Sequence, residues 1–163
     1  MMSGRPPAWT DEQRRIYGEL LTVLGPDLLR QVGRRGGPGA ILLSLIGRAL
    51  VLGHAEPGPD GTRVAYVRSF PHGTLPPNTG GWTWGNVIAI LPEDRDNRPR
   101  LLHEYVHVLQ YRREGLRYPW RYLRSGLYNW EHNPYEVQAV RAEGYYIQHA
   151  WLPPLWEIAG LQA

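Results

Sequence analysis

The sequence predicts an α+β fold in which a short, mostly antiparallel sheet packs on a helical body. Apolar residues recur at helical spacing near both ends of the chain, whereas the middle has short apolar runs separated by Gly/Pro turns. The 163 residues are 42% hydrophobic and lack cysteine, so one domain can form a core without disulfides. We expect a single domain (1–163) with N-terminal helices and a loop (1–39), a sheet region (40–91) and helices that carry the candidate site (92–163).

The N-terminal region is expected to be helical. Thr10 and Gln13 form a capping box, and apolar residues follow at positions 16, 20, 21 and 24. Gly25 and Pro26 should end this helix, and a second short helix is expected immediately after them, over residues 27–32. The Gly- and Arg-rich run that follows, up to residue 39, predicts a loop.

The sheet region begins with an apolar segment, residues 40–52, for which two structures stay open. Residues 41–46 fit a buried helix, whereas residues 49–52 look more like a strand. Both structures place the segment inside the core.

Turn signals separate the strands that follow. Residues 57–61 are a Pro/Gly turn, and residues 62–68 alternate between two faces, which together predict a hairpin. After a long Gly/Pro loop over residues 71–81, the apolar run 82–91 predicts another strand, entered through a glycine-marked bend.

Local capping signals define the helices of the third region. A helix is expected over residues 98–114. Asp96 or Asn97 is a suitable N-cap for it, Pro99 fits its first turn, and Gly115 should end it. Two further helices are expected in this region, over residues 118–128 and, after an Asn-Pro cap, over residues 134–149.

The most informative run of residues, His103-Glu104-Tyr105-Val106-His107, lies within the expected helix 98–114. Residues four apart share a helix face, so both imidazoles can reach one metal ion, and Glu104 then stands beside a metal-bound water. This is the HExxH pattern of zinc hydrolases, with two His ligands and a Glu general base. It predicts one Zn²⁺ ion; the alternative is that both histidines are surface residues or hydrogen-bonded core residues.

A catalytic zinc needs a third protein ligand, and Glu136 is our choice. It lies in the first turn of the expected helix 134–149, which can pack against the helix of the histidines. The alternative role of Glu136 is a capping-box residue that reaches back to the N-cap. Glu143, seven residues on along the same face, is an alternative ligand or a carboxylate that orients an imidazole through its free N–H.

Two segments resemble the gluzincin metallopeptidases, in particular small bacterial members with a HExxHxxQ helix and a downstream NPxE helix. These segments are Leu-Leu-His-Glu-Tyr-Val-His-Val-Leu-Gln (101–110) and Asn-Pro-Tyr-Glu-Val-Gln-Ala (133–139). The resemblance implies a zincin-like fold, His103, His107 and Glu136 as metal ligands and Glu104 as the base. It also implies that an extended peptide or protein substrate pairs with the strand before the metal helix, at Gly85, Asn86, Val87 and Ile88.

The stabiliser of a developing oxyanion is left open by the sequence. Tyr128, His132 and Tyr135 flank the expected Glu136 ligand, and each has a hydrogen-bond donor. A structural role is the alternative for all three. The Trp- and Tyr-rich run 118–130 is either part of the core or the lining of an apolar pocket beside the metal. Gln110 is expected to be a structural hydrogen-bonding residue.

The leading function is therefore a zinc-dependent metallohydrolase, most simply a small peptidase. One alternative is a non-catalytic binding module that keeps a zinc site. Another is a nucleic-acid-associated protein, because all 18 basic residues are arginine and the net charge is +3. No block of like charge exceeds a pair, so nucleic acid is the less favoured partner.

Targeting signals are missing from the sequence. The N-terminus lacks a basic-then-apolar signal pattern, and the most apolar stretch is too short for a membrane span and is interrupted by Gly47 and Arg48. We therefore expect a cytoplasmic protein without a membrane partner; the sequence leaves the oligomeric state open.

Overall fold

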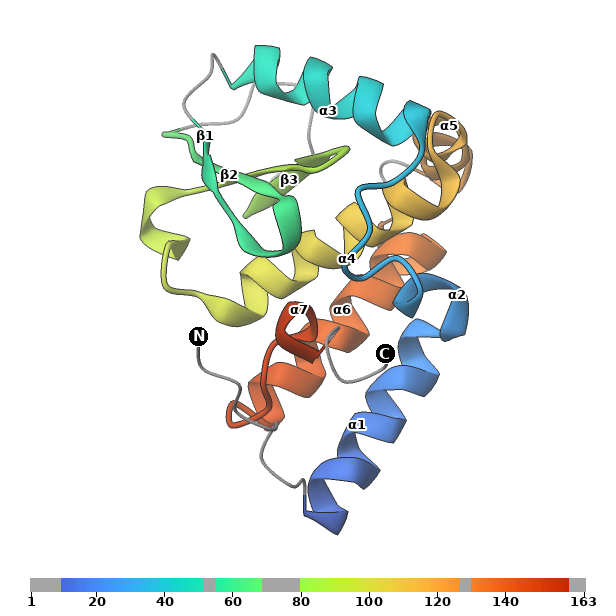
Figure 1. The fold of residues 1–163 in the computed structure, drawn as a ribbon, viewed down its shortest axis with the longest axis vertical. Coiled ribbons are helices and arrows are strands. Elements are labelled where there is room, and N and C mark those ends of the chain that lie inside the picture. Colours follow the sequence, from blue (N-terminus) through green and yellow to red (C-terminus); the bar gives the residue numbers. More distant parts are fainter. Residues whose placement is uncertain (1–9, 52–54, 69–79, 127–129, 159–163) are drawn as a thin grey trace, which may run out of the picture.

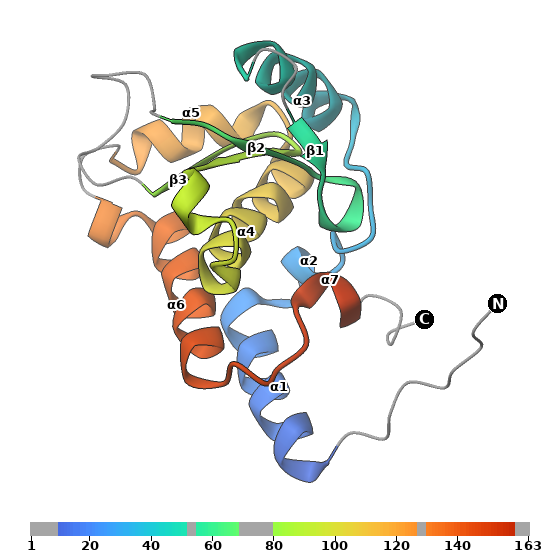
Figure 2. The ribbon, with the colours of Figure 1, turned by 90° about the vertical axis from the view of Figure 1, so that its left-hand side faces the viewer.

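A computed structural model describes residues 10–51, 55–68, 80–126 and 130–158. Its elements are stacked in layers: α3 lies on one face of a small sheet, α4 lies under the other face, and α6 and α1 lie beyond α4 (Figures 1 and 2). The α+β class is confirmed. The sheet has four strands and is mixed, because one of its three strand pairs is parallel.

The N-terminal helices cover the outer side of α6. Helix α1 (Asp11–Leu24) buries Ile16, Leu20 and Leu24 along one stripe, as the spacing predicts. Helix α2 (Pro26–Leu29) is shorter than expected, and residues 30–33 form turns after it. Gly25 separates the two helices with φ of 75°, a value that favours glycine.

Helix α3 (Pro38–Leu50) confirms the helix over residues 41–46 but not its burial, and it replaces the start of the strand expected over 49–52. Residues 49 and 50 are helical rather than part of a strand, and residue 52 lies outside the described residues. The residues that α3 packs on the sheet include small ones, Ala40, Ser44 and Gly47, and a Cβ on Gly47 would lie 2.8 Å from the carbonyl oxygen of Trp84. Residues 41, 42, 45 and 46 are exposed, so the expected burial of the helix over 41–46 is wrong. An apolar run alone does not tell which face of a helix is covered.

The sheet has the order β1-β2-β4-β3. Its strands are β1 (Ala55–Pro57), β2 (Arg63–Tyr66), β3 (Gly81–Trp84) and β4 (Val87–Ile90). The hairpin β1–β2 around the 3₁₀ turn η1 (Pro59–Gly61) is confirmed. The single strand expected over 82–91 is wrong, because Gly85 (φ 61°) and Asn86 form a two-residue turn between β3 and β4.

Strand β4 is the buried centre of the sheet. It pairs with β2 on one edge and β3 on the other, and all four of its residues are buried. Ile88 and Ile90 join the main core with α4, whereas Val87 and Ala89 join the smaller cluster on the α3 side. Alternating residues therefore bury both faces, as expected for a fully covered strand.

Helix α4 (Arg98–Glu114) has the bounds that the sequence predicts. The side chain of Asn97 accepts a hydrogen bond from the Arg100 N–H at 3.1 Å, and Gly115 ends the helix with φ of 57°. Eleven consecutive residues, 102–112, are buried, because the sheet covers one side of α4 and other helices cover the rest. This burial makes α4 the central helix.

The C-terminal elements surround α4. They are α5 (Arg117–Arg124), the 3₁₀ turn η3 (Trp130–His132), α6 (Pro134–Gln148) and α7 (Leu155–Ile158). Asn133 caps α6 by accepting from the Tyr135 N–H, as expected. Helix α5 ends before residue 128, the end expected from the sequence, and residues 127–129 lie outside the described residues.

Candidate metal centre

Helices α4 and α6 bring the three expected ligands together. His103 and His107 lie one turn apart on α4, and their Nε2 atoms are 3.3 Å apart. Glu136 lies in the first turn of α6, with Oε2 at 3.4 Å from His103 Nε2 and Oε1 at 3.3 Å from His107 Nε2. Ala139 and Ala142 are fully buried on α6, and small side chains there let the two helices approach closely. The group could hold a metal ion.

Each imidazole has a partner on its outer nitrogen. Glu143 Oε2 lies 3.0 Å from His103 Nδ1, and a carboxylate only accepts, so Nδ1 donates. Gln110 donates its Nε2 to the carbonyl of Tyr135 (3.1 Å) and therefore presents its Oε1 to His107 Nδ1 at 2.8 Å. Both Nδ1 atoms therefore carry protons, and both Nε2 atoms face Glu136.

With neutral imidazoles, the two Nε2 lone pairs would face each other and the oxygens of Glu136. Such an arrangement of acceptors is unfavourable without a positive charge between them. Burial lowers the pKa of His103, but hydrogen bonds to Glu136 and Glu143 outweigh this effect and raise it to about 10. Burial opposes ionisation of Glu136, yet the charge of His107 and the hydrogen bonds hold the Glu136 pKa well below its usual range. The site therefore favours a cation, and a metal ion would replace the proton held there.

Glu104 lies beside this group and is held by the sheet. Its side chain is buried, and Oε2 accepts a hydrogen bond from Thr83 Oγ1 of strand β3 at 2.7 Å. Strand β3 approaches so closely that a Cβ on Gly81 would lie 2.2 Å from Glu104 Oε1. Burial lowers the pKa of both site imidazoles. The negative charge of Glu104 is one of the effects that raise it. The carboxylate is therefore fixed between the sheet and the histidines.

Two tyrosines of α5 also contact the site, and the sequence named them only as part of the Trp- and Tyr-rich run 118–130. The hydroxyl of Tyr122 donates to Glu136 Oε1, and its ring packs edge-on against His107 with centroids 6.3 Å apart. Tyr118, one turn earlier, places its hydroxyl 3.1 Å from His107 Nδ1 and 3.2 Å from Gln110 Oε1. Their i, i+4 spacing is the signal that could have marked them, because it puts both on one face of α5.

Of the three expected oxyanion residues, the structure describes Tyr135 and His132. The hydroxyl of Tyr135 donates to Glu114 Oε2 at 3.0 Å, which occupies it away from Glu136. The side chain of His132 is exposed in η3, and Tyr128 lies outside the described residues. Among these three, only the backbone carbonyl of Tyr135 takes part in the described site, through Gln110.

The expected substrate strand, residues 85–88, is corrected by the sheet topology. Gly85 and Asn86 form a turn, and Val87 and Ile88 belong to the central strand β4, whose two edges are already paired. A strand with both edges paired has no backbone groups left for a peptide. In the described part of the chain, the edge strand nearest Glu104 is β3.

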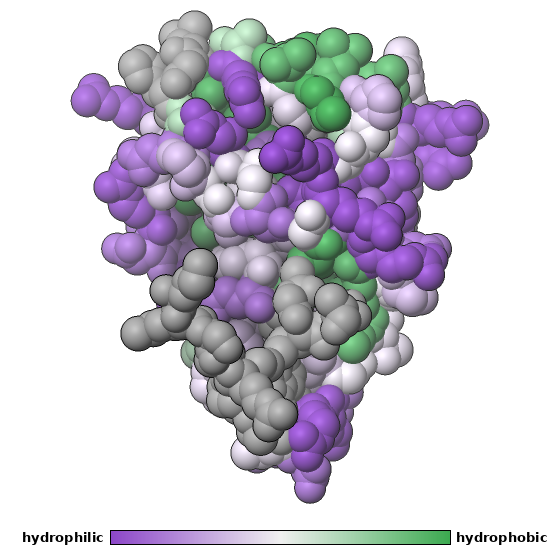
Figure 3. All heavy atoms as spheres, viewed as in Figure 1, coloured by the Kyte–Doolittle hydropathy of each residue, from purple (hydrophilic) through white to green (hydrophobic). Residues whose placement is uncertain are grey.

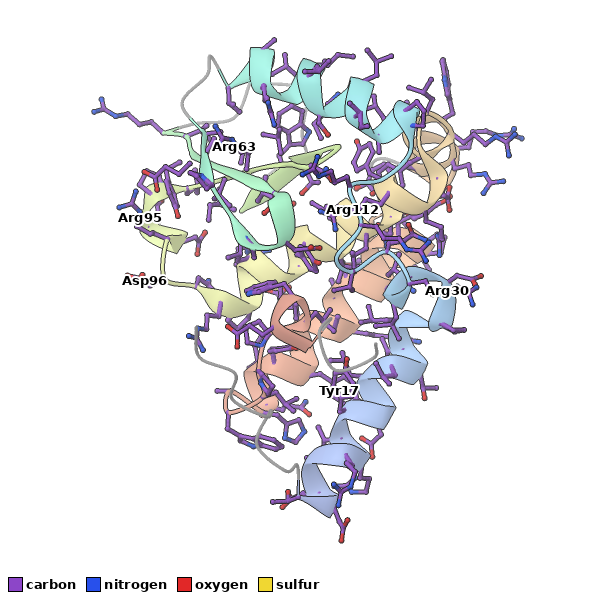
Figure 4. All side chains as sticks on the ribbon, in the orientation of Figure 1. Tyr17, Arg30, Arg63, Arg95, Asp96 and Arg112 are labelled. Carbon is purple, nitrogen blue, oxygen red and sulfur yellow. The ribbon has the colours of Figure 1, made fainter. Side chains whose placement is uncertain are left out.

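A second buried charged cluster lies farther along α4. Arg112, whose side chain is fully buried, pairs with Asp60 and also donates to Asn86 Oδ1 (3.0 Å) and the Gln31 carbonyl (3.2 Å). Asp60 further accepts from the Tyr105 hydroxyl and from a loop N–H that follows α2. Figure 4 shows Arg112 among these elements, whereas Arg30 and Arg95 lie at the surface.

Comparisons of the chain with protein-family models, curated proteins and solved structures gave no match. Within the described residues, no helix is both long and apolar enough to cross a membrane.

Proposed function

We propose that this protein is a zinc-dependent metallohydrolase of gluzincin type, with a zincin-like fold. One observation carries the proposal: the Nε2 atoms of His103 and His107 lie 3.3 Å apart, and each faces one oxygen of the Glu136 carboxylate, at 3.4 and 3.3 Å. For atoms about 2.0–2.1 Å from a zinc ion at the corners of a tetrahedron, neighbouring ligands lie about 3.3 Å apart. The spacing and the His₂Glu donor set therefore both fit zinc.

The described donor set favours a catalytic over a structural metal. It consists of three residues, His103, His107 and Glu136, and catalytic zinc sites combine three protein ligands with an open position. A bound Zn²⁺ ion would supply a water of lowered pKa and polarise a substrate carbonyl. Glu104 is the base that takes the proton from the attacking water, and the Thr83 hydroxyl holds its carboxylate in place.

The proposed substrate is an extended peptide that pairs with β3. This strand lies at the sheet edge, and its Thr83 and Gly81 contact Glu104, so a peptide along β3 would pass beside the base. Edge strands offer unpaired N–H and C=O groups to such a ligand. The proposal thus keeps strand addition but moves it from residues 85–88 to β3.

Tyr122 is the proposed stabiliser of the oxyanion. It is a hydroxyl donor that already contacts the Glu136 ligand and packs on the ring of His107. A donor fixed beside the reacting carbonyl lowers the free energy of the charged transition state. Tyr122 thus replaces the three candidates taken from the sequence.

The decisive experiment pairs metal analysis with peptide hydrolysis. The wild-type protein is expected to contain one zinc per chain and to cleave unstructured polypeptides such as casein. Glu104→Gln should retain the zinc and lose hydrolysis, because the amide cannot accept the proton; a rate loss on the order of 10³-fold or more is expected.

Glu131→Gln is the matched control, because Glu131 is exposed in η3 and undergoes the same chemical change. It should keep both zinc and activity. Wild-type protein without bound metal would reject the proposal, and unchanged turnover in Glu104→Gln would reject the assignment of the base.

A non-catalytic zinc site is the second candidate, and burial of the ligands favours it. His103 is 7% exposed and His107 is 6% exposed, which limits access by a large substrate. This function predicts full zinc occupancy and no hydrolysis in the wild type. It also predicts that the Glu104→Gln variant is indistinguishable from wild type in every assay except stability.

A further inference from the structure

Helix α3 exposes five of its six Ile and Leu side chains, and the sixth, Leu43, is buried. The five are exposed by between 41% and 55%, and they are Ile41, Leu42, Leu45, Ile46 and Leu50. Small residues, Ala40, Ser44 and Gly47, are among those that face the sheet instead. Figure 3 shows the hydrophobic side chains gathered at the end of the molecule where Figure 1 places α3. The usual polarity of a surface helix is therefore reversed.

Helix α5 continues this apolar surface. Leu116, at its start, packs against the first turn of α3, where a Cβ on Gly39 would lie 3.1 Å from Leu116 Cγ. Trp120 is 72% exposed and Leu123 is 49% exposed. Figures 1 and 2 place both helices at the same end of the molecule. We refer to these exposed residues of α3 and α5 as the α3–α5 face.

Positive charge surrounds the α3–α5 face. Residues 28–55 and 115–130 contain seven arginines and no acidic residue, whereas the rest of the chain has eleven arginines and fifteen acidic residues. Arg48, Arg117 and Arg124 are exposed on the two helices. Two of the seven arginines pair with carboxylates just outside these segments, Arg30 with Asp27 and Arg121 with Glu114, so the positive charge of the α3–α5 face depends mainly on Arg48, Arg117 and Arg124.

We propose that the α3–α5 face docks on an anionic lipid bilayer as a peripheral membrane surface. Aliphatic side chains with a Trp and an arginine rim match a surface that enters the headgroup region, and the absence of carboxylates in the two segments suits anionic lipid. A peripheral membrane surface needs no membrane-spanning helix. The expectation of no membrane partner depended on the lack of such a helix in the sequence, and that reasoning does not apply to a peripheral surface.

Other occupants fit less well. A stable protein interface takes about 20–30 residues a side, whereas the described apolar residues of the α3–α5 face are eight. Nucleic acid would place five aliphatic side chains against phosphates. A fluid bilayer can bind a small apolar surface, because it requires no shape complementarity.

Co-sedimentation of the full-length, metal-loaded protein with lipid vesicles tests this proposal. Binding is expected with phosphatidylcholine vesicles that contain about 30% phosphatidylglycerol, and it should be weak with phosphatidylcholine alone. Leu42→Ser with Leu45→Ser should reduce the partition coefficient at least about tenfold, because the apolar contact is lost. Arg117→Gln with Arg124→Gln should reduce it by about 30-fold at low salt and less at high salt.

The control variants change the same residue types elsewhere. Ile147→Ser alters an exposed aliphatic residue of α6, and Arg141→Gln alters an exposed arginine of α6; both should bind like wild type. Circular dichroism and zinc content verify folding of each variant. No binding to anionic vesicles overturns the proposal, as does equal binding by Leu42→Ser with Leu45→Ser. A dimer in solution that this double variant dissociates, without vesicle binding, assigns the face to a second copy instead.

Discussion

Helix α4 has two buried clusters of charged side chains that differ in how their hydrogen bonds are completed. Around Arg112, donors meet acceptors: the guanidinium faces the Asp60 carboxylate, the Asn86 side chain and a backbone carbonyl. Around His103 and His107, the Nε2 lone pairs meet the carboxylate of Glu136. The first cluster is complete within the described chain, whereas the second favours a cation from outside.

This difference separates two roles for buried charge in one helix. A buried pair that has all its partners fixes the positions of elements, and Arg112 joins α4 to the β3–β4 turn, to η1 and to the loop after α2. A buried group with excess acceptors is costly until a ligand satisfies it. Variants of the Arg112 cluster should therefore lower stability with or without zinc, whereas variants of the histidine cluster should alter zinc binding and the part of the stability that zinc supplies.

The largest expected effect comes from breaking the complete cluster. Asp60→Asn removes the charge that faces Arg112 while keeping a residue that tolerates the local φ of 51°. Loss of one partner of a buried pair should lower the free energy of unfolding by about 3 kcal/mol, measured by urea denaturation. Zinc content should stay unchanged, and a loss of zinc would contradict the separation of the two clusters.

The control for Asp60→Asn is an ion pair at the surface. Glu56→Gln disrupts the contact with Arg95, whose side chain is 55% exposed. This change should cost less than about 1 kcal/mol in the same denaturation assay.

Metal removal should have the next largest effect. Zinc at about 100 times its dissociation constant should raise the free energy of unfolding by about 2.7 kcal/mol, seen as a higher Tm than with a chelator. Glu136→Ala should abolish this increment because a ligand is lost, whereas Asp60→Asn should keep it on a lower baseline. An undiminished zinc-dependent rise in Glu136→Ala would show that the metal binds elsewhere.

The carboxylate that orients His103 should have an intermediate effect. Glu143→Ala removes the acceptor of the Nδ1 proton, and zinc affinity should fall by about 10–100-fold. Competition with a chromophoric chelator measures this change. Glu131→Ala, at an exposed position, should leave the affinity unaltered, and an equal loss in both variants would argue for a nonspecific electrostatic effect.

The smallest predicted effect tests how closely β3 approaches Glu104. Gly81→Ala places a Cβ 2.2 Å from Glu104 Oε1, so the carboxylate must move. Unfolding free energy should fall by about 1–3 kcal/mol, and hydrolysis should fall while zinc stays bound. Gly144→Ala is the matched control: a Cβ there meets nothing within 4 Å, and the helical alanine should stabilise by about 0.5–1 kcal/mol.

The sequence predicted those parts of the fold and the site that depend on local chemistry. The bounds of α4 were correct because Asn97 and Gly115 cap it with local hydrogen bonds and backbone angles. His103 and His107 share a face because helical periodicity requires it. Glu136 met them because the Asn133-Pro134 cap starts α6 at a fixed residue, and α6 packs on α4.

The errors arose where tertiary packing or turn chemistry decided the structure. The β3–β4 hairpin was missed because Gly85 and Asn86 were included in one continuous strand, 82–91. A strand was favoured for residues 49–52 because the run is short and contains a β-branched residue, but a helix accommodates such a run as well. Tyr122 was missed because its contact with Glu136 depends on the orientation of α5, which no local signal fixes.

The spacing of the ligands along the chain has a mechanical consequence. His107 and Glu136 belong to different helices and are separated by the whole of α5 and η3. An ion bound to both would close a loop in a polypeptide that has no cysteine with which to make a permanent cross-link. The concentration of free zinc would then determine both hydrolytic activity and the lifetime of the packing of α6 on α4.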